Sequence, residues 1–107
     1  MENKEIFQLV NRCLVIRMPE EIDHHHAAYY SENADWYILR EDVEQVVFDF
    51  EDTVFMDSSG IGILMGRYKK MACLGGAVYV VHADRQILRM LCLAGADRYL
   101  QIVREEE

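Results

Sequence analysis

The sequence of 107 residues contains one proline and no long apolar run. Its longest uncharged stretch, residues 71–81, is far shorter than the roughly 20 residues that a membrane-spanning helix needs. The first residues, MENKEIFQ, contain no apolar signal core. Apolar residues make up 51% of the chain, which excludes a disordered segment. We therefore expect one folded domain over residues 1–107, soluble and located in the cytoplasm.

Cysteine is also scarce, with three residues, Cys13, Cys73 and Cys92. An odd number at such wide separations gives no disulfide framework and no paired-cysteine metal site. Each cysteine lies among apolar neighbours, so we expect buried and reduced thiols.

Positive charge is in short supply. The chain has 11 Lys and Arg residues against 19 Asp and Glu residues, which gives a formal net charge of -8. A field of this sign repels phosphate backbones and anionic lipids. We therefore expect neither nucleic acid nor a membrane as a partner.

The hydrophobic pattern predicts short strands that alternate with amphipathic helices. Strands are expected at residues 6–10, 13–18, 43–50, 77–81 and 100–103, with a short extended piece at 54–56. Helices are expected from a cap at Asp23 to about Arg40, from Ser59 to the glycines at 75–76, and from a cap at Asp84 to about Leu93. The order β-β-α-β-α-β-α-β predicts an α/β fold, in which helices pack on a mixed, mostly parallel sheet of about five strands.

The most informative segment is FMDSSGIGILMGRYKK, where a strand ends and a helix begins. The first N–H groups of a helix have no partner within the helix and carry partial positive charge. One serine of the pair Ser58 and Ser59 can cap these groups, which leaves the other hydroxyl free to point outward. Gly60, Gly62 and Gly66 follow, and each glycine inside a helix costs about 1 kcal/mol relative to alanine.

Two explanations of that cost stay open at this point. In the first, Asp57 and Ser59 only cap the helix, and the glycines permit another element of the domain to pack closely. In the second, an external surface approaches the bare backbone. The loops that hold Asp23 and Asp57 both follow strands, at the edge of the sheet where α/β proteins place functional residues.

Other kinds of site fit the same segment less well. A dinucleotide fingerprint needs its third glycine one residue earlier than Gly66, and no acidic residue ends the strand at 77–81 to bind a ribose. A receiver domain phosphorylated on Asp57 needs an acidic pair after the first strand. Acyl transfer needs a GxSxG elbow around the serine. The histidines at 24–26 begin a helix, where adjacent side chains diverge, so they do not predict a metal site.

The same residues resemble a known family. The run FMDSSGIGILMGRYKK, preceded by VVFDFED and followed by GGAVYVV, is similar to the STAS domain of anti-sigma factor antagonists, including those of sporulating bacteria. EIDHH near the start matches the family's loop with an acidic residue before the first helix. The resemblance covers essentially the whole chain. It implies a STAS-like fold and no catalytic activity, and we expect no metal and no cofactor.

The resemblance also implies a phosphorylation switch. An unmodified family member binds an anti-sigma factor that is also a serine kinase, which releases the sigma factor for transcription. The kinase phosphorylates the first serine of the pair, here Ser58, and the modified form dissociates until a metal-dependent PP2C-type phosphatase restores it. The partner-binding residues implied by the match are Asp23, His24, Asp57, Ser59, Gly60, Ile61, Gly62 and Arg67. A STAS module of another partner-switching pathway, in stress or sensory signalling, and nucleotide binding at the same loops stay open as alternatives.

Overall fold

The computed structural model describes residues 5–104. The elements follow in the order β1 (Phe7–Val10), β2 (Cys13–Arg17), β3 (Glu21–Ile22), α1 (His24–Arg40), β4 (Gln45–Asp49), β5 (Phe55–Met56), α2 (Ser58–Cys73), β6 (Ala77–Val81), α3 (Arg85–Leu93), the 3-10 helix η1 (Ala96–Arg98) and β7 (Gln101–Ile102). The predicted alternation of strands and helices is confirmed. The structure adds β3 and η1, and α2 begins one residue earlier than the sequence predicted.

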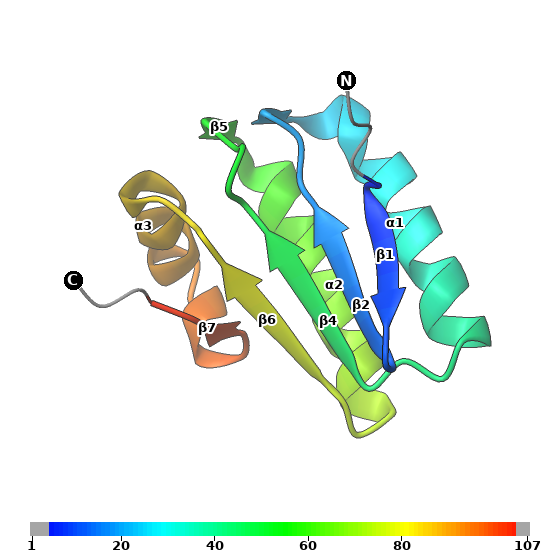
Figure 1. Ribbon diagram of the computed structural model, residues 1–107. Coiled ribbons are helices and arrows are strands. Elements are labelled where there is room, and N and C mark those ends of the chain that lie inside the picture. Colours follow the sequence, from blue (N-terminus) through cyan, green and yellow to red (C-terminus); the bar gives the residue numbers. More distant parts are fainter. Residues whose placement is uncertain (1–4, 105–107) are drawn as a thin grey trace.

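Five strands form the main sheet, in the order β1-β2-β4-β6-β7 (Figure 1). β1 pairs with β2 in antiparallel orientation, and the other neighbours are parallel. Asn11 and Arg12 join the two antiparallel strands with φ angles of 48° and 68°. Two residues of positive φ form the turn that matches the twist of a hairpin. The predicted hairpin and the predicted mixed, mostly parallel sheet are therefore confirmed.

Helices α1 and α2 lie side by side against one face of this sheet (Figure 1). Alternate residues of the three inner strands point to that face and are fully buried, namely Leu14, Ile16, Val46, Phe48, Val78 and Val80. The residues between them point to the opposite face and are mostly half-buried, because side chains alternate along a strand. The apolar core thus lies between the sheet and the helices, and no helix within residues 5–104 covers the other face.

The cysteines depart from the expectation of buried thiols. Cys13 is half-buried, whereas Cys73 and Cys92 are exposed. In α3 the neighbouring Leu91 takes the fully buried position. Successive helical residues are about 100° apart around the axis, so Cys92 faces away from the core.

An ion pair joins α1 and α2 in their interface. Arg67 is 7% exposed. Its Nε lies 3.0 Å from Asp35 Oδ1 on α1, without the geometry of a hydrogen bond. Burial lowers the pKa of the Arg67 guanidinium, and the charge of Asp35 opposes that shift. Lys70 Nζ lies 3.4 Å from the other Asp35 oxygen, at the solvent side of the pair.

Replacement of Arg67 by alanine should remove the partner that neutralises the Asp35 carboxylate. We expect Arg67→Ala to lower the free energy of unfolding by about 3 kcal/mol, at the lower end for broken buried pairs, because Asp35 still reaches water. Urea denaturation followed by circular dichroism measures this change. Lys70→Ala removes the more exposed cation and should cost less than about 1 kcal/mol. An equal decrease in the free energy of unfolding of the two variants would show that burial of the pair does not increase its contribution to stability.

Candidate functional site

The start of α2 is built around the carboxylate of Asp57. This residue is the N-cap, and its Oδ1 accepts hydrogen bonds from the backbone N–H of Ser59, at 2.8 Å, and from the Ser59 hydroxyl. Its carbonyl oxygen accepts from the N–H of Gly60. The sequence predicted a cap made by one of the serines or by Asp57, and the structure assigns it to Asp57 with Ser59 as its partner.

Ser58 occupies the first turn of α2 with its side chain exposed. Within residues 5–104 its hydroxyl takes part in no hydrogen bond, in contrast to that of Ser59. The two serines are therefore inequivalent. The hydroxyl of Ser59 supports the helix cap, and the hydroxyl of Ser58 is available to another molecule.

The loop that holds Asp23 lies next to this helix start. β3 and β5 are two-residue strands that pair in parallel, with Ile22 opposite Met56. The Asp57 N–H continues the pairing and donates to the Ile22 carbonyl oxygen at 3.0 Å. Asp23 is itself the N-cap of α1, where it accepts from the His25 N–H at 2.9 Å. The pairing thus sets two capped helix starts beside each other.

Both capping carboxylates are held in the ionised form. Hydrogen bonds from the side chain and backbone of Ser59 lower the pKa of Asp57, and the charge of His24 adds to this shift, while burial and the Asp23 charge oppose it. Burial raises the pKa of Asp23, but the hydrogen bonds and charges of the following histidines outweigh it and lower that pKa. The site therefore carries two adjacent negative charges at neutral pH.

The glycines of α2 divide into two kinds. A Cβ added at Gly60 would clash with the Met56 side chain and press on Ile22, so this glycine is required by packing inside the domain. A Cβ added at Gly62 or Gly66 would meet no atom within 4 Å. Gly62 is exposed one turn beyond Ser58, on the same side of the helix. Both explanations left open by the sequence therefore apply, each to a different glycine.

The structure brings together most of the residues implied by the resemblance. His24 is exposed beside Asp23, and Ile61 is half-buried against the core next to the exposed Gly62. Arg67 lies apart from them, in the interface between α1 and α2 and paired with Asp35. Its position gives it a role in holding α2, and only an indirect one at the surface.

Sequence reasoning missed an apolar groove beside this site. Val54 and Phe55 precede the helix start and are 62% and 52% exposed, and Leu93 of α3 is 79% exposed. With Met56, Met90 and their neighbours they line a groove of about 330 Å³. The only available signal was the pair of apolar residues immediately before Met56, which the pattern assigned to an extended piece.

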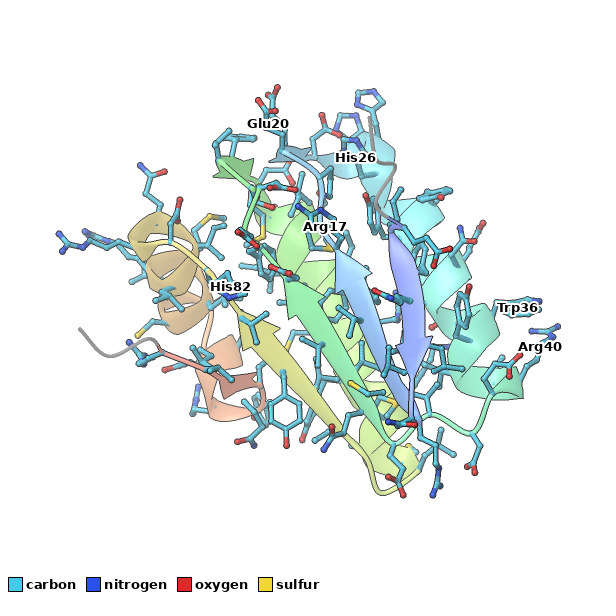
Figure 2. All side chains as sticks on the ribbon, in the orientation of Figure 1. Arg17, Glu20, His26, Trp36, Arg40 and His82 are labelled. Carbon is cyan, nitrogen blue, oxygen red and sulfur yellow. The ribbon has the colours of Figure 1, made fainter. Side chains whose placement is uncertain are left out.

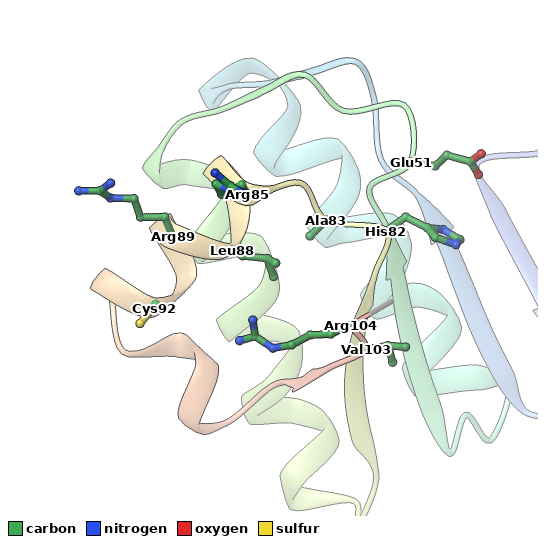
Figure 3. Close-up of a pocket in the computed structure, with 9 residues that line it drawn as sticks. All are labelled: Glu51, His82, Ala83, Arg85, Leu88, Arg89, Cys92, Val103 and Arg104. Atoms are coloured by element: carbon green, nitrogen blue, oxygen red, sulfur yellow. The ribbon is translucent and has the colours of Figure 1, made fainter. Parts of the chain in front are cut away.

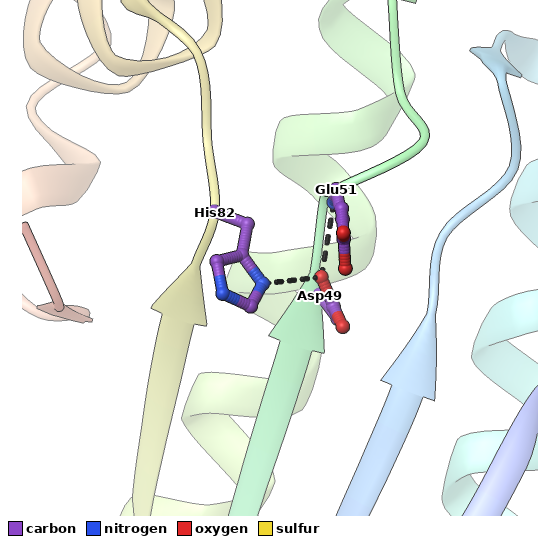
Figure 4. A group of neighbouring side chains, drawn as sticks. All are labelled: Asp49, Glu51 and His82. Atoms are coloured by element: carbon purple, nitrogen blue, oxygen red, sulfur yellow. Dashed lines mark hydrogen bonds and ion pairs between the residues drawn. The ribbon is translucent and has the colours of Figure 1, made fainter. Parts of the chain in front are cut away.

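A separate polar cluster lies where β4 and β6 end (Figure 4). His82 Nδ1 lies 3.0 Å from Asp49 Oδ1, and the Glu51 N–H donates to the same oxygen at 2.9 Å. One potential ligand atom from each of the three residues lies within 4.8 Å of the others. Carboxylate and imidazole groups are ligands for divalent cations. Exposed acidic groups are common without a cation, so this cluster by itself does not define a metal site.

Residues 6–107 match the STAS domain family, and the chain belongs to this family. Within residues 5–104, no helix combines the length and the apolar character needed to cross a bilayer. The STAS-like fold that the serine segment led us to expect is confirmed.

Individual relatives indicate which members of the STAS family this chain resembles. The chain is 32% identical to an anti-sigma F factor antagonist of Paenibacillus polymyxa over 93 residues, which are 87% of this chain and 80% of the relative. Its fold is similar to that of the anti-sigma factor antagonist SpoIIAA in the unphosphorylated form, with a TM-score of 0.78, 23% identity and coverage of 94% and 87% of the two chains. The fold is also similar to that of the Bacillus cell fate determinant SpoIIAA in the phosphorylated form, with a TM-score of 0.75 and 25% identity. This match covers 92% of this chain and 90% of that chain.

The two kinds of glycine predict opposite effects on stability. Gly60→Ala should lower the free energy of unfolding by about 1–3 kcal/mol, because the new methyl group has to displace Met56. Gly62→Ala should raise it by about 0.5–1 kcal/mol, because the methyl group meets open space and alanine favours the helix. Urea denaturation of both variants tests the pair. Gly66→Ala is a second open position and should resemble Gly62→Ala in stability.

The lowered pKa of Asp57 predicts a contribution to stability that depends on pH. Because folding lowers this pKa, the ionised carboxylate stabilises the fold above about pH 4, and the contribution is lost as pH falls through the folded value. Asparagine also caps helices, so Asp57→Asn should stay folded at neutral pH and lose less stability than the unchanged protein on acidification. Thermal unfolding between about pH 2 and pH 7 measures both curves, and identical acid limbs would contradict the assignment.

Proposed function

We propose that this chain is an anti-sigma factor antagonist that docks through the start of α2 and the neighbouring Asp23 loop. The observation that carries the proposal is the exposed Ser58 hydroxyl, which has no hydrogen-bond partner within residues 5–104 and lies beside the open backbone at Gly62. Membership of the STAS family and the 32% identity to an anti-sigma F factor antagonist support it. In this function the unmodified chain binds an anti-sigma factor, and the sigma factor is released for transcription.

The physical basis of docking is close approach to a bare helix surface. Ser58 and Gly62 lie one turn apart and present no side chain larger than a hydroxymethyl group. A partner can therefore reach the helix backbone itself. The ionised carboxylates of Asp23 and Asp57 flank this surface and favour basic or hydrogen-donating groups on the partner.

Phosphorylation of Ser58 would switch this surface off. A phosphate adds about -1.5 to -2 charges at neutral pH. It would stand beside Asp57 and Asp23, on a chain whose formal net charge is already -8. Burying a dianion against a closely fitting partner is costly, and its volume fills the space above Gly62. Ser58 is exposed, so the phosphate can stand in solvent and the fold itself need not change.

The remaining components follow from this function. The anti-sigma factor acts as the serine kinase, and a PP2C-type phosphatase removes the phosphate. The chain itself then acts by binding, in the cytoplasm, and the likeness to anti-sigma F factor antagonists favours a role in sporulation. The solved phosphorylated form of a relative supports a phosphorylated state here.

Incubation with the cognate anti-sigma kinase, ATP and magnesium should add one phosphate to this chain, seen by intact-protein mass spectrometry. Ser58→Ala should abolish the uptake. Ser59→Ala is the matched control: it removes the adjacent hydroxyl, which is engaged by Asp57, and should leave most of the uptake intact. Full phosphorylation of Ser58→Ala would show that Ser58 is not the phosphate acceptor.

A charge at residue 58 should weaken docking without unfolding the domain. We expect Ser58→Glu to raise the dissociation constant for the anti-sigma factor at least about tenfold, and to move the midpoint of thermal unfolding by less than about 4 °C, the shift for roughly 1 kcal/mol. Gln8→Glu adds the same charge at an exposed position of β1 and should bind normally. A large loss of thermal stability in Ser58→Glu alone would instead favour a purely structural role for the helix start.

A further inference from the structure

A second surface of the domain is hollowed, on the side of α3 (Figure 3). A cleft of about 900 Å³ lies between this helix, the end of β6 and the segment after β7. Its lining residues are Glu51, His82, Ala83, Arg85, Leu88, Arg89, Cys92, Val103 and Arg104. None of them belongs to the docking surface proposed above, so a function of this cleft is independent of the Ser58 switch.

Three arginines line the cleft. Arg85 and Arg89 lie one turn apart on α3, where like charges repel each other. Arg104 comes from the far end of the sequence and extends across the cleft toward α3 (Figure 3). Within residues 5–104, none of these three side chains forms an ion pair. By contrast, Arg12, Arg17 and Arg67 each pair with at least one carboxylate.

This grouping is unusual for so acidic a chain. Residues 1–57 contain fourteen Asp and Glu against four Lys and Arg, whereas residues 58–107 contain seven Lys and Arg against two Asp and the three Glu at 105–107. The two Asp of the second part are Asp84 and Asp97, and Asp84 caps α3 through the Ile87 N–H at 2.9 Å. Glu51 is the one acid in the lining, and Figure 3 shows it at the far end of the cleft from α3. The part of the cleft next to α3 is therefore basic.

The chemistry of the lining suits a phosphate group. A guanidinium presents a planar fork of N–H donors that can bind two phosphate oxygens at once. An ammonium group acts as a point charge and lacks this geometry. The volume is within the range of about 300–1,000 Å³ typical of small-molecule sites. Leu88, Ala83 and Val103 supply apolar surface beside the arginines. A flat protein partner would not require a hollow of this size, so the cleft favours a small molecule.

We propose that this cleft binds a small phosphoanion of at least two negative charges, held by Arg85 and Arg104 with Arg89 at the rim. The anion would relieve the repulsion between the arginines and occupy the basic end of the hollow. The N-terminal start of α3 is not the binding element, because the Asp84 carboxylate caps it through the Ile87 N–H and would repel an anion.

Inorganic pyrophosphate is a suitable probe for the whole chain. Titration at low ionic strength, followed by ¹H–¹⁵N NMR, should shift amide signals of residues 82–92 and 102–104 with a dissociation constant of about 1 mM or below. Arg85→Gln and Arg104→Gln should each weaken binding about fivefold or more. Arg40→Gln is the control: it removes an arginine that extends from α1 over Trp36, away from the cleft (Figure 2), and should bind as the unchanged protein does.

Three outcomes would overturn the proposal. One is equal weakening by Arg40→Gln and Arg104→Gln, which would mean bulk attraction. Another is a shift confined to residues 57–60, which would place the anion at the start of α2. The third is tighter binding of a glutamate hexapeptide, or of vesicles containing phosphatidylglycerol, than of pyrophosphate, which would mean a docking surface for an acidic protein or a membrane. Localised shifts that both cleft variants weaken would establish the site.

Discussion

The candidate site depends on one backbone hydrogen bond, from the Asp57 N–H to the Ile22 carbonyl oxygen. It extends the pairing of β3 with β5, and this pairing places the N-caps of α1 and α2 next to each other. Two-residue strands have little stability of their own. The pair persists because Ile22 and Met56 are buried under it, at 0% and 4% exposure, and because Gly60 leaves room for the Met56 side chain. The exposed hydroxyl of the site is thus positioned from beneath by apolar packing.

Charge is distributed unevenly between the two proposed binding surfaces. The proposed docking surface carries the ionised Asp23 and Asp57, whereas the cleft beside α3 is lined by Arg85, Arg89 and Arg104. At physiological ionic strength the field of an exposed charge falls off over about 8 Å. Two regions of opposite sign can therefore coexist on one small domain, and each can select its own ligand despite the net charge of -8.

The sequence carried much of the fold and part of the site, for identifiable reasons. Periodic apolar residues predicted α1 and β6, and the acid after each loop predicted the caps Asp23 and Asp57. β3 escaped prediction because two residues have no period, whereas β5 lies within the extended piece expected at 54–56. The pairing of Arg67 with Asp35 joins positions on different helices, which no local pattern reveals. Gly60 and Gly62 look alike in the sequence, and only the direction in which each faces separates packing from exposure. The arginine cleft likewise unites α3 with a segment beyond β7.

Helix α2 is held at two points, by the contact of Gly60 with Met56 at its start and, farther along, by the ion pair of its Arg67 with Asp35 of α1. Both contacts oppose tilting or unwinding of α2 if its first residue is modified. The modified and unmodified states would then differ by a covalent bond at residue 58 and not by the conformation of the domain. The lifetime of the modified state would be set by the enzymes that make and break that bond. No slow conformational relaxation of the domain would delay the change between the two states.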